Sequence, residues 1–180
     1  MLIGLLRSKV GALFYFCRRI YFYPFFKSSN IIIGRNLSVR GWKGKNQFGE
    51  NLVIYDNVIF ESHNEDGQIS IGKNCILSYG VIISCKHKIE IGNDVWIGEY
   101  SSIRDSTHKF SIALTLKDSI DYDMPIKIGN NVWIGKNCLI FPGSKIEDNV
   151  VIGANSIVKG NCVANSLYVG NPAYLKKKLF

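Results

Sequence analysis

Residues 126–162 read IKIGNNVWIGKNCLIFPGSKIEDNVVIGANSIVKGNC, and three registers of this stretch repeat every six residues. The first register holds large aliphatic residues: Ile128, Ile134, Ile140, Ile146, Ile152 and Val158. The second holds small or β-branched residues: Val132, Cys138, Ser144, Val150, Ser156 and Cys162. The third holds Asn or Gly: Asn131, Asn137, Gly143, Asn149, Asn155 and Asn161. Neither a helix period of 3.6 nor a plain strand period of 2 produces this pattern.

Each six-residue unit is therefore predicted to be a short strand followed by a corner. The aliphatic side chains point inward, where successive coils stack, and the small residues point inward at a tighter place. The Asn/Gly register tolerates the left-handed backbone region that a sharp corner demands. Three such sides close a triangular coil of about 18 residues, and stacked coils form a prism with one continuous core.

The six-residue period also occurs earlier in the chain. It runs through Ile71, Leu77, Ile83 and Ile89 and then, after a slip of two residues, through Ile91, Ile97 and Ile103. Ile33 and Val39 begin a weaker version, and residues 40–70 are the least regular. The period stops at Ile103 and resumes at Ile126, so residues 104–125 are predicted to leave the prism as an extended loop. An insertion of this kind is usually functional.

The composition fits one globular domain. The chain has 180 residues, of which 47% are hydrophobic and 20% charged, so it is neither disordered nor membrane-embedded in bulk. Five cysteines, an odd number with no CxxC pair, argue against a disulfide framework or a zinc ribbon. We expect a reducing, cytoplasmic compartment, with the cysteines at inward or hidden positions.

The positive charge is concentrated at the N-terminal end. Nine bases precede the first acidic residue, Glu50, and the remaining 13 bases and 14 acids sum to −1. Residues 1–28 are predicted to form an amphipathic helical segment, 29–175 the prism, and 176–180 a basic tail. The helical segment, too short in its uncharged runs to span a bilayer, is interpreted either as a cap on the prism or as a contact with anionic lipid at the inner face of the cell membrane. No nucleic-acid-binding motif accompanies it.

The segments IGNNVWIGKNCLIFPGSKIEDNVVIGANSIVKG (128–160) and IGNDVWIGEYSSIRDSTH (91–108) resemble the hexapeptide-repeat acyltransferases. The resemblance implies an all-β fold, a left-handed parallel β-helix. It further implies acetyl-CoA as co-substrate and a homotrimer with active sites between neighbouring subunits. Within the family the chain is similar to the sugar O-acetyltransferases, and its aromatic, basic N-terminal segment is similar to that of members that modify bacterial surface polysaccharides.

Acetyl transfer to a hydroxyl requires a base, and histidine suits that task near neutral pH. Of the three histidines, His108 lies where the period breaks, and the resemblance places the catalytic base there. His87 is interpreted as a corner residue, and nothing in the sequence selects His63. Three histidines also leave open a zinc site of the carbonic anhydrase kind, assembled across subunits. No metal is otherwise expected.

The resemblance assigns further site residues. Positions matching the donor site are Trp133, Gly135, Lys136, Ala154, Lys159 and Lys177, with backbone N–H groups at Gly135 and Lys136 as oxyanion donors. Trp96 is the weaker counterpart of Trp133. Ser78 stands where several sugar acetyltransferases carry an acceptor-binding Asn, so a different acceptor is expected. Asp105 is interpreted as orienting the imidazole or binding a sugar hydroxyl.

The function expected is acetyl-CoA-dependent O-acetylation of a sugar in a bacterial surface polysaccharide or its precursor, with His108 as general base. Two alternatives remain open. One is N-acetylation of an amino-sugar nucleotide, or O-acetylation of an antibiotic, by the same fold. The other is a non-catalytic β-helix scaffold.

Overall fold

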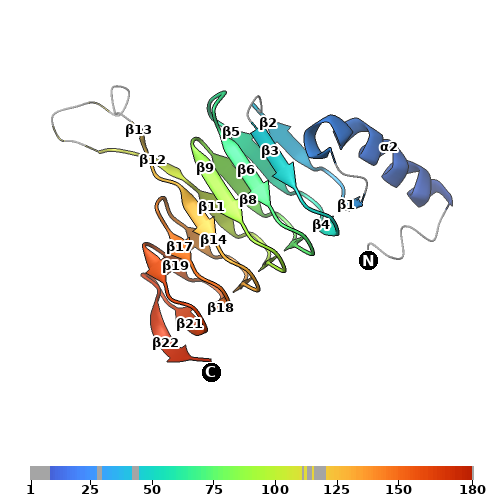
Figure 1. The fold of residues 1–180 in the computed structure, drawn as a ribbon. Helices are drawn as coiled ribbons and strands as arrows, with labels where there is room; N and C mark the ends of the chain where they lie inside the picture. Colours follow the sequence, from blue (N-terminus) through green and yellow to red (C-terminus); the bar gives the residue numbers. More distant parts are fainter. Residues whose placement is uncertain are drawn as a thin grey trace.

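The computed structural model describes residues 9–27, 30–41, 45–110, 112, 115 and 121–179. The chain forms a three-sided parallel β-helix with one helix, α2 (Lys9–Phe26), lying over its N-terminal end (Figure 1). The predicted all-β hexapeptide-repeat prism with an N-terminal helix is confirmed. Each coil contributes one strand to each of three sheets, which are named A, B and C in chain order.

Sheet A orders its strands β1 (Ile31–Ile33), β4 (Leu52–Ile54), β7 (Ile76–Leu77), β10 (Trp96–Ile97), β15 (Trp133–Ile134), β18 (Val150–Ile152), β21 (Ser166–Val169) and β22 (Tyr174–Lys178). Sheet B holds β2 (Ser38–Arg40), β5 (Ile59–Ser62), β8 (Ile82–Cys85), β11 (Ser102–Arg104), β16 (Leu139–Ile140) and β19 (Ile157–Val158). Sheet C holds β3 (Lys45–Phe48), β6 (Gln68–Ile71), β9 (Lys88–Ile91), β14 (Ile126–Ile128), β17 (Lys145–Ile146) and β20 (Asn161–Cys162).

The inward rows behave as their residue types predict. The aliphatic row from Ile128 to Val158 and the small row from Val132 to Cys162 are both buried, as are Ile91, Ile97 and Ile103. Asn131, Asn137, Gly143, Asn149 and Asn155 all have positive φ, as predicted for corners. Asn161 is the exception, because Gly160 takes the positive φ at that corner and Asn161 begins β20.

The 18-residue coil holds only in the C-terminal half. Trp133 pairs with Val151 and Ile128 with Ile146, 18 residues apart in each case. Earlier coils are longer: Ile31 pairs with Leu52, 21 residues on, and Val53 with Ile76, 23 residues on. Extra residues in the turns between sheets B and C, such as the one after Ser62, lengthen these coils without disturbing the sheets. This explains why residues 40–70 looked irregular although their strands stack regularly.

The predicted break is a hairpin. Strands β12 (Ser106–His108) and β13 (Asp121–Asp123) pair antiparallel and protrude from the corner between sheets B and C (Figure 1). Most of the loop between them lies outside the described residues. The prism resumes at β14, which stacks on β9.

Both ends of the prism are covered. At the N-terminal end Phe26 of α2 packs against Phe48 and Phe60, with ring centroids 4.7 and 5.9 Å away, so the helix does cap the core. At the C-terminal end β22 pairs antiparallel with β21. The expected basic tail is therefore in part a strand, since Lys176, Lys177 and Lys178 belong to β22.

The helix is not amphipathic in the predicted sense. Its side away from the prism is apolar, and its exposed large apolar side chains are those of Leu13, Phe14, Phe16, Ile20, Tyr21 and Tyr23. Arg18 and Arg19 are half-buried. No helix in the described part of the chain is long and apolar enough to cross a membrane.

Candidate active site

The outer faces of the three sheets differ in chemistry. Sheet C presents charged side chains, among them the ion pairs Lys88–Glu90 (2.9 Å) and Lys145–Glu147 (3.4 Å). Sheets A and B present more apolar residues, such as Val53 and Val151 on A, and Ile82, Leu139 and Ile157 on B, although sheet B also carries Glu61 and Arg104. The two pockets described below lie on sheets A and B.

The pocket on sheet A has a volume of about 450 Å³ and gathers five of the predicted site residues. Ser78, Trp133, Gly135, Lys136 and Ala154 all line it, although they come from three different levels of the prism, those of β7, β15 and β18. Trp96 also lines it and is the register partner of Trp133 on the neighbouring strand. Both indoles project outward and are more than half exposed, as expected for aromatic rings too large for the interior. Ser78 therefore shares a pocket with the donor-site residues.

Gly135 makes the close stacking of this region possible. A Cβ at Gly135 would lie 2.6 Å from the backbone nitrogen of Ala154. Its N–H donates to the carbonyl of Ile152 at 2.8 Å within the ladder between coils. This amide is already committed and does not fit the predicted role of oxyanion donor, which leaves the amide of Lys136 as the candidate.

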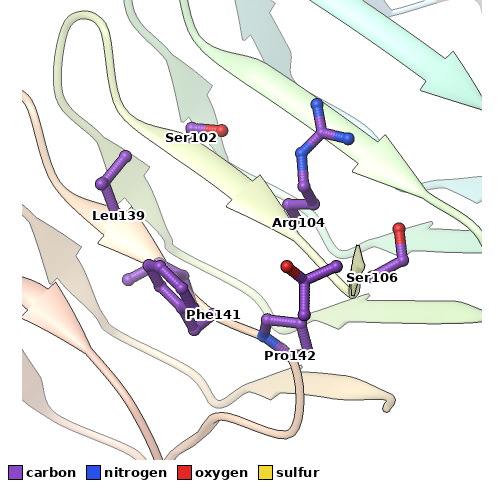
Figure 2. A pocket seen from close by; sticks show the side chains of 8 residues that line it. Ser102, Arg104, Ser106, Leu139, Phe141 and Pro142 are labelled. Carbon is purple, nitrogen blue, oxygen red and sulfur yellow. The ribbon is translucent and has the colours of Figure 1, made fainter. Parts of the chain in front are cut away.

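His108 lies on the hairpin, on strand β12, and its side chain is exposed. Its neighbour Thr107 lines the pocket on sheet B, which has a volume of about 220 Å³ (Figure 2). The other lining residues come from β11, β12, β16 and the segment after β16: Ser102, Arg104, Ser106, Leu139, Ile140, Phe141 and Pro142. The two pockets share no lining residue.

Asp105 does not reach solvent, and this corrects the expectation that it binds a sugar hydroxyl. Its side chain is fully buried, and its carboxylate accepts backbone N–H groups from Lys86 (2.7 Å), His87 (2.8 Å) and Lys88 (2.7 Å). Its own carbonyl accepts the N–H of Met124, at the return of the hairpin. Asp105 thus ties the root of the hairpin to the preceding coil.

Two predicted donor-site lysines lie apart from the sheet A pocket of their own chain. Lys159 places its Nζ 4.6 Å from the ring centroid of Phe141, beside the pocket on sheet B. Lys177 is exposed on β22, opposite Leu167.

A polar cluster on sheet B was not selected from the sequence. Glu61, Ser84 and Arg104 are successive register partners on β5, β8 and β11, and His63 joins them. His63 Nε2 lies 2.8 Å from Ser84 Oγ. The register partners are separated by 23 and 20 residues because the turns differ in length. The cluster could therefore not be predicted from a regular spacing in the sequence.

Four of the five cysteine thiols are buried. Burial raises the pKa of Cys75, Cys85, Cys138 and Cys162, and that of Cys162 to about 11. Cys17 is exposed on α2, contrary to the expectation that all five cysteines are hidden. Within the described ranges, no three His, Cys, Asp or Glu side chains are grouped to hold a metal ion.

Comparison with known proteins agrees with this architecture. The bacterial transferase hexapeptide family, described as six repeats, matches residues 125–164. Escherichia coli WbbJ, provisionally assigned as a lipopolysaccharide biosynthesis O-acetyl transferase, is 31% identical over 144 residues, which cover 75% of this chain and 72% of WbbJ. The crystal structure of a maltose O-acetyltransferase from Clostridium difficile 630 is 30% identical, with a TM-score of 0.57, over 92% of this chain and 76% of that one.

AntD is an N-acyltransferase from Bacillus cereus that was crystallised with a dTDP-amino sugar and coenzyme A. Its structure matches 89% of this chain and 88% of its own length with a TM-score of 0.77 and 22% sequence identity, which shows a shared fold. The chain spans about half the length of two other curated relatives. The stacked six-residue coils define a hexapeptide-repeat protein. The chain belongs to the hexapeptide-repeat acetyltransferase family.

Proposed function

We propose that the chain transfers an acetyl group from acetyl-CoA to a hydroxyl of a sugar in a bacterial surface polysaccharide or its precursor. The observation that carries the proposal is the convergence of Ser78, Trp133, Lys136 and Ala154 on one open pocket. The relatives named for sugar O-acetylation support the acceptor class.

The sheet A pocket fits the donor. Its volume of about 450 Å³ and its mainly apolar lining suit the pantetheine arm of coenzyme A, which Trp96 and Trp133 would flank. The backbone N–H of Lys136 would stabilise negative charge on the reacting carbonyl oxygen. When bound, the thioester supplies the acetyl group.

His108 would act from a second copy. The pocket of sheet A and the hairpin of sheet B lie on different faces of one prism. The outer faces of A and B carry more apolar side chains than the charged face of C, so A and B are better suited to contact with another copy. Packing face A of one copy on face B of the next is a head-to-tail contact, and a rotation of about 120° between copies would close it into the proposed homotrimer. His108 of one protomer would then stand beside the Trp133 pocket of its neighbour.

In this arrangement His108 takes the proton from the acceptor hydroxyl as its oxygen attacks the thioester carbonyl. The new C–O bond forms, the C–S bond breaks, and the imidazolium returns the proton to the departing thiolate of coenzyme A. No acyl group is carried by the protein. Buried cysteines whose pKa values are raised are consistent with a direct transfer.

The test compares His108→Asn with His87→Asn, since both histidines are exposed and only His108 is on the hairpin. Product is measured by mass spectrometry with acetyl-CoA and a panel of acceptors that includes amino-sugar nucleotides. We expect His108→Asn to lower kcat by roughly 10²- to 10⁴-fold with little change in the Kd for coenzyme A, and His87→Asn to be near wild type. Near-full activity of His108→Asn would overturn the proposed base. Failure of the wild-type protein to retain coenzyme A would favour a non-catalytic scaffold.

We also propose that α2 contacts an anionic membrane surface. Its outer side exposes Phe14, Phe16, Ile20 and Tyr21, and the first 49 residues carry nine bases and no acid. An apolar surface on a segment rich in bases suits anionic lipid better than a neighbouring copy of the same basic helix.

Removing α2 would uncover the core under Phe26, so point variants test the membrane contact more cleanly. The double variant Phe16→Ser/Ile20→Ser is compared with the control Val163→Ser/Leu175→Ser, which removes exposed apolar residues elsewhere. We expect the first to lose sedimentation with phosphatidylglycerol vesicles and the control to keep it. Equal binding of both variants, or equal binding to phosphatidylcholine vesicles, would refute the contact.

A further inference from the structure

The polar cluster on sheet B converges on one guanidinium. Arg104 Nη2 lies 3.7 Å from Glu61 Oε2, and Arg104 Nη1 lies 3.4 Å from His63 Nε2. Ser84 Oγ donates to Glu61 Oε2 at 3.1 Å. Ser84 is fully buried, although it lies on the outer face of its strand. Glu61 and His63 therefore hold the guanidinium of Arg104 on one side, and both contact Ser84 in turn.

Arg104 also contributes to the lining of the sheet B pocket, and its guanidinium extends away from Phe141 and Pro142 (Figure 2). A guanidinium has five N–H donors, and the long distances to Glu61 and His63 leave several of them for a ligand. The side chain of Arg104 is 44% exposed and contributes to the pocket lining. Figure 2 shows Arg104 and Ser106 on one side of the pocket and Phe141 and Pro142 on the other.

The lining of this pocket is suited to a charged sugar. Arg104 is the one charged residue among its eight lining residues, all of which lie in the described part of the chain. Lys159 adds a second cation above the ring of Phe141. Ser102, Ser106 and Thr107 offer hydroxyls, and Phe141 with Pro142 offers a flat apolar surface against which a sugar ring packs.

We infer that the pocket bounded by Arg104 and Phe141 is an acceptor subsite for a sugar unit carrying a carboxylate or phosphate. Arg104 pairs with the anionic group, and planar two-point contact with a carboxylate or phosphate is the geometry that arginine provides. Thr107 of the pocket lining adjoins His108 in the sequence, so a bound unit lies beside the proposed base. The inference rests on the proposed function and narrows its acceptor to acidic saccharides.

Glu61, Ser84 and His63 are positioning residues in this reading. They hold Arg104 and are not themselves placed in the pocket lining. The 3′-phosphate of coenzyme A is a second source of the same anionic chemistry, and the experiment separates it from the acceptor.

Binding is measured first, without turnover, by saturation-transfer NMR on the full-length protein. The probes are methyl β-glucuronide, glucose 1-phosphate, neutral methyl β-glucoside and adenosine 3′,5′-bisphosphate. The variant is Arg104→Gln, and the control is Lys88→Gln, which removes one positive charge from the face of sheet C. We expect wild type to bind an acidic sugar at least about tenfold more tightly than the glucoside, a preference lost in Arg104→Gln and kept in Lys88→Gln.

Glucuronide and glucose 1-phosphate binding that is insensitive to Arg104→Gln would overturn the inference. The inference would also be overturned if Arg104→Gln lost binding of adenosine 3′,5′-bisphosphate alone, because the pocket would then be part of the coenzyme A site. Turnover is measured second: kcat/KM for acidic acceptors should fall about tenfold or more in Arg104→Gln, with neutral acceptors and the Kd for coenzyme A changed less than about threefold. Because binding is measured separately, absence of turnover would refute the proposed acetyl transfer but would leave the evidence for the acceptor subsite unchanged.

Discussion

Asp105 and His108 stand three residues apart at the root of one hairpin, with Asp105 fully buried and His108 exposed. The carboxylate of Asp105 accepts three backbone N–H groups from residues 86–88, and this fixes the strand from which His108 projects. A buried anchor and an exposed imidazole are what the proposed base requires if it is to be held rigidly.

Asp105→Asn should therefore impair catalysis and stability together. The amide nitrogen of Asn cannot accept a hydrogen bond, so at least one buried N–H loses its charged partner at a cost of about 2 kcal/mol. Measured well below the melting temperature of the variant, kcat should fall at least about tenfold while the KM for acetyl-CoA stays within about threefold. Asp94→Asn, at an exposed corner where Asp94 accepts from Asn74, is the control and should be nearly silent. Unchanged kcat in a destabilised Asp105→Asn would restrict Asp105 to a purely structural role.

Asp56 and Arg35 should make stability depend on acid pH. Burial alone would raise the pKa of Asp56, but hydrogen bonds from the Arg35 backbone and guanidinium outweigh it and hold the pKa below its ordinary 3.8. Because the folded-state pKa is lowered, the stabilisation is complete above the unfolded pKa and is lost as pH falls through the folded one.

The comparison is between urea unfolding of wild type and of Asp56→Asn. At pH 7 the variant should be less stable by about 2 kcal/mol, and the difference should shrink below about pH 4. A difference that stays constant from pH 7 to pH 3 would contradict the assigned ion pair.

Trp133→Ala should weaken donor binding. Trp133 is a large aromatic wall of the sheet A pocket, and truncating such a contact costs on the order of 1–2 kcal/mol, or about tenfold in Kd. Isothermal titration with coenzyme A measures this directly. Tyr174→Ala, which removes an exposed aromatic from β22, is the control and should leave the Kd unchanged. Equal Kd values for wild type and Trp133→Ala would move the donor away from this pocket.

One thiol per chain should react rapidly with Ellman's reagent in the native protein. Cys17 is exposed, whereas the other four thiols are buried and their pKa values are raised, so little thiolate is available at pH 8. Cys17→Ser should abolish the rapid phase, and denaturation should release all five thiols of wild type. A rapid phase remaining in Cys17→Ser would show that the prism opens.

The sequence predicted the prism well because its core is periodic. The six-residue spacing alone predicts which residues from Ile128 to Val158 point inward. The corner at Asn131 is predicted because a corner needs a residue that tolerates positive φ. The grouping of Ser78 with Trp133 came from the family resemblance, since nothing in their separation of 55 residues brings them together.

The parts of the site that the sequence could not predict depend on turns of unequal length and on the hairpin that interrupts the repeat. The approach of His63 to Ser84 depends on the length of the turn between β5 and β6, which follows no period. Asp105 looked like a loop residue because the repeat ends before it, yet inward alternation continues for two residues beyond Ile103. The strand at Lys176–Lys178 has a polar sequence and forms because β21 would otherwise end the sheet unpaired.

The number of stacked coils also sets the distance between α2 and the sheet A pocket. In sheet A, β15 is the fourth strand beyond β1, so at about 4.8 Å per strand Trp133 stands about 19 Å along the axis from the coil beneath α2. With the helix on a bilayer, the prism would work as a ruler that holds the reaction at a fixed height. An acceptor still attached to its lipid would then be modified only at the sugar whose position along the glycan matches that height.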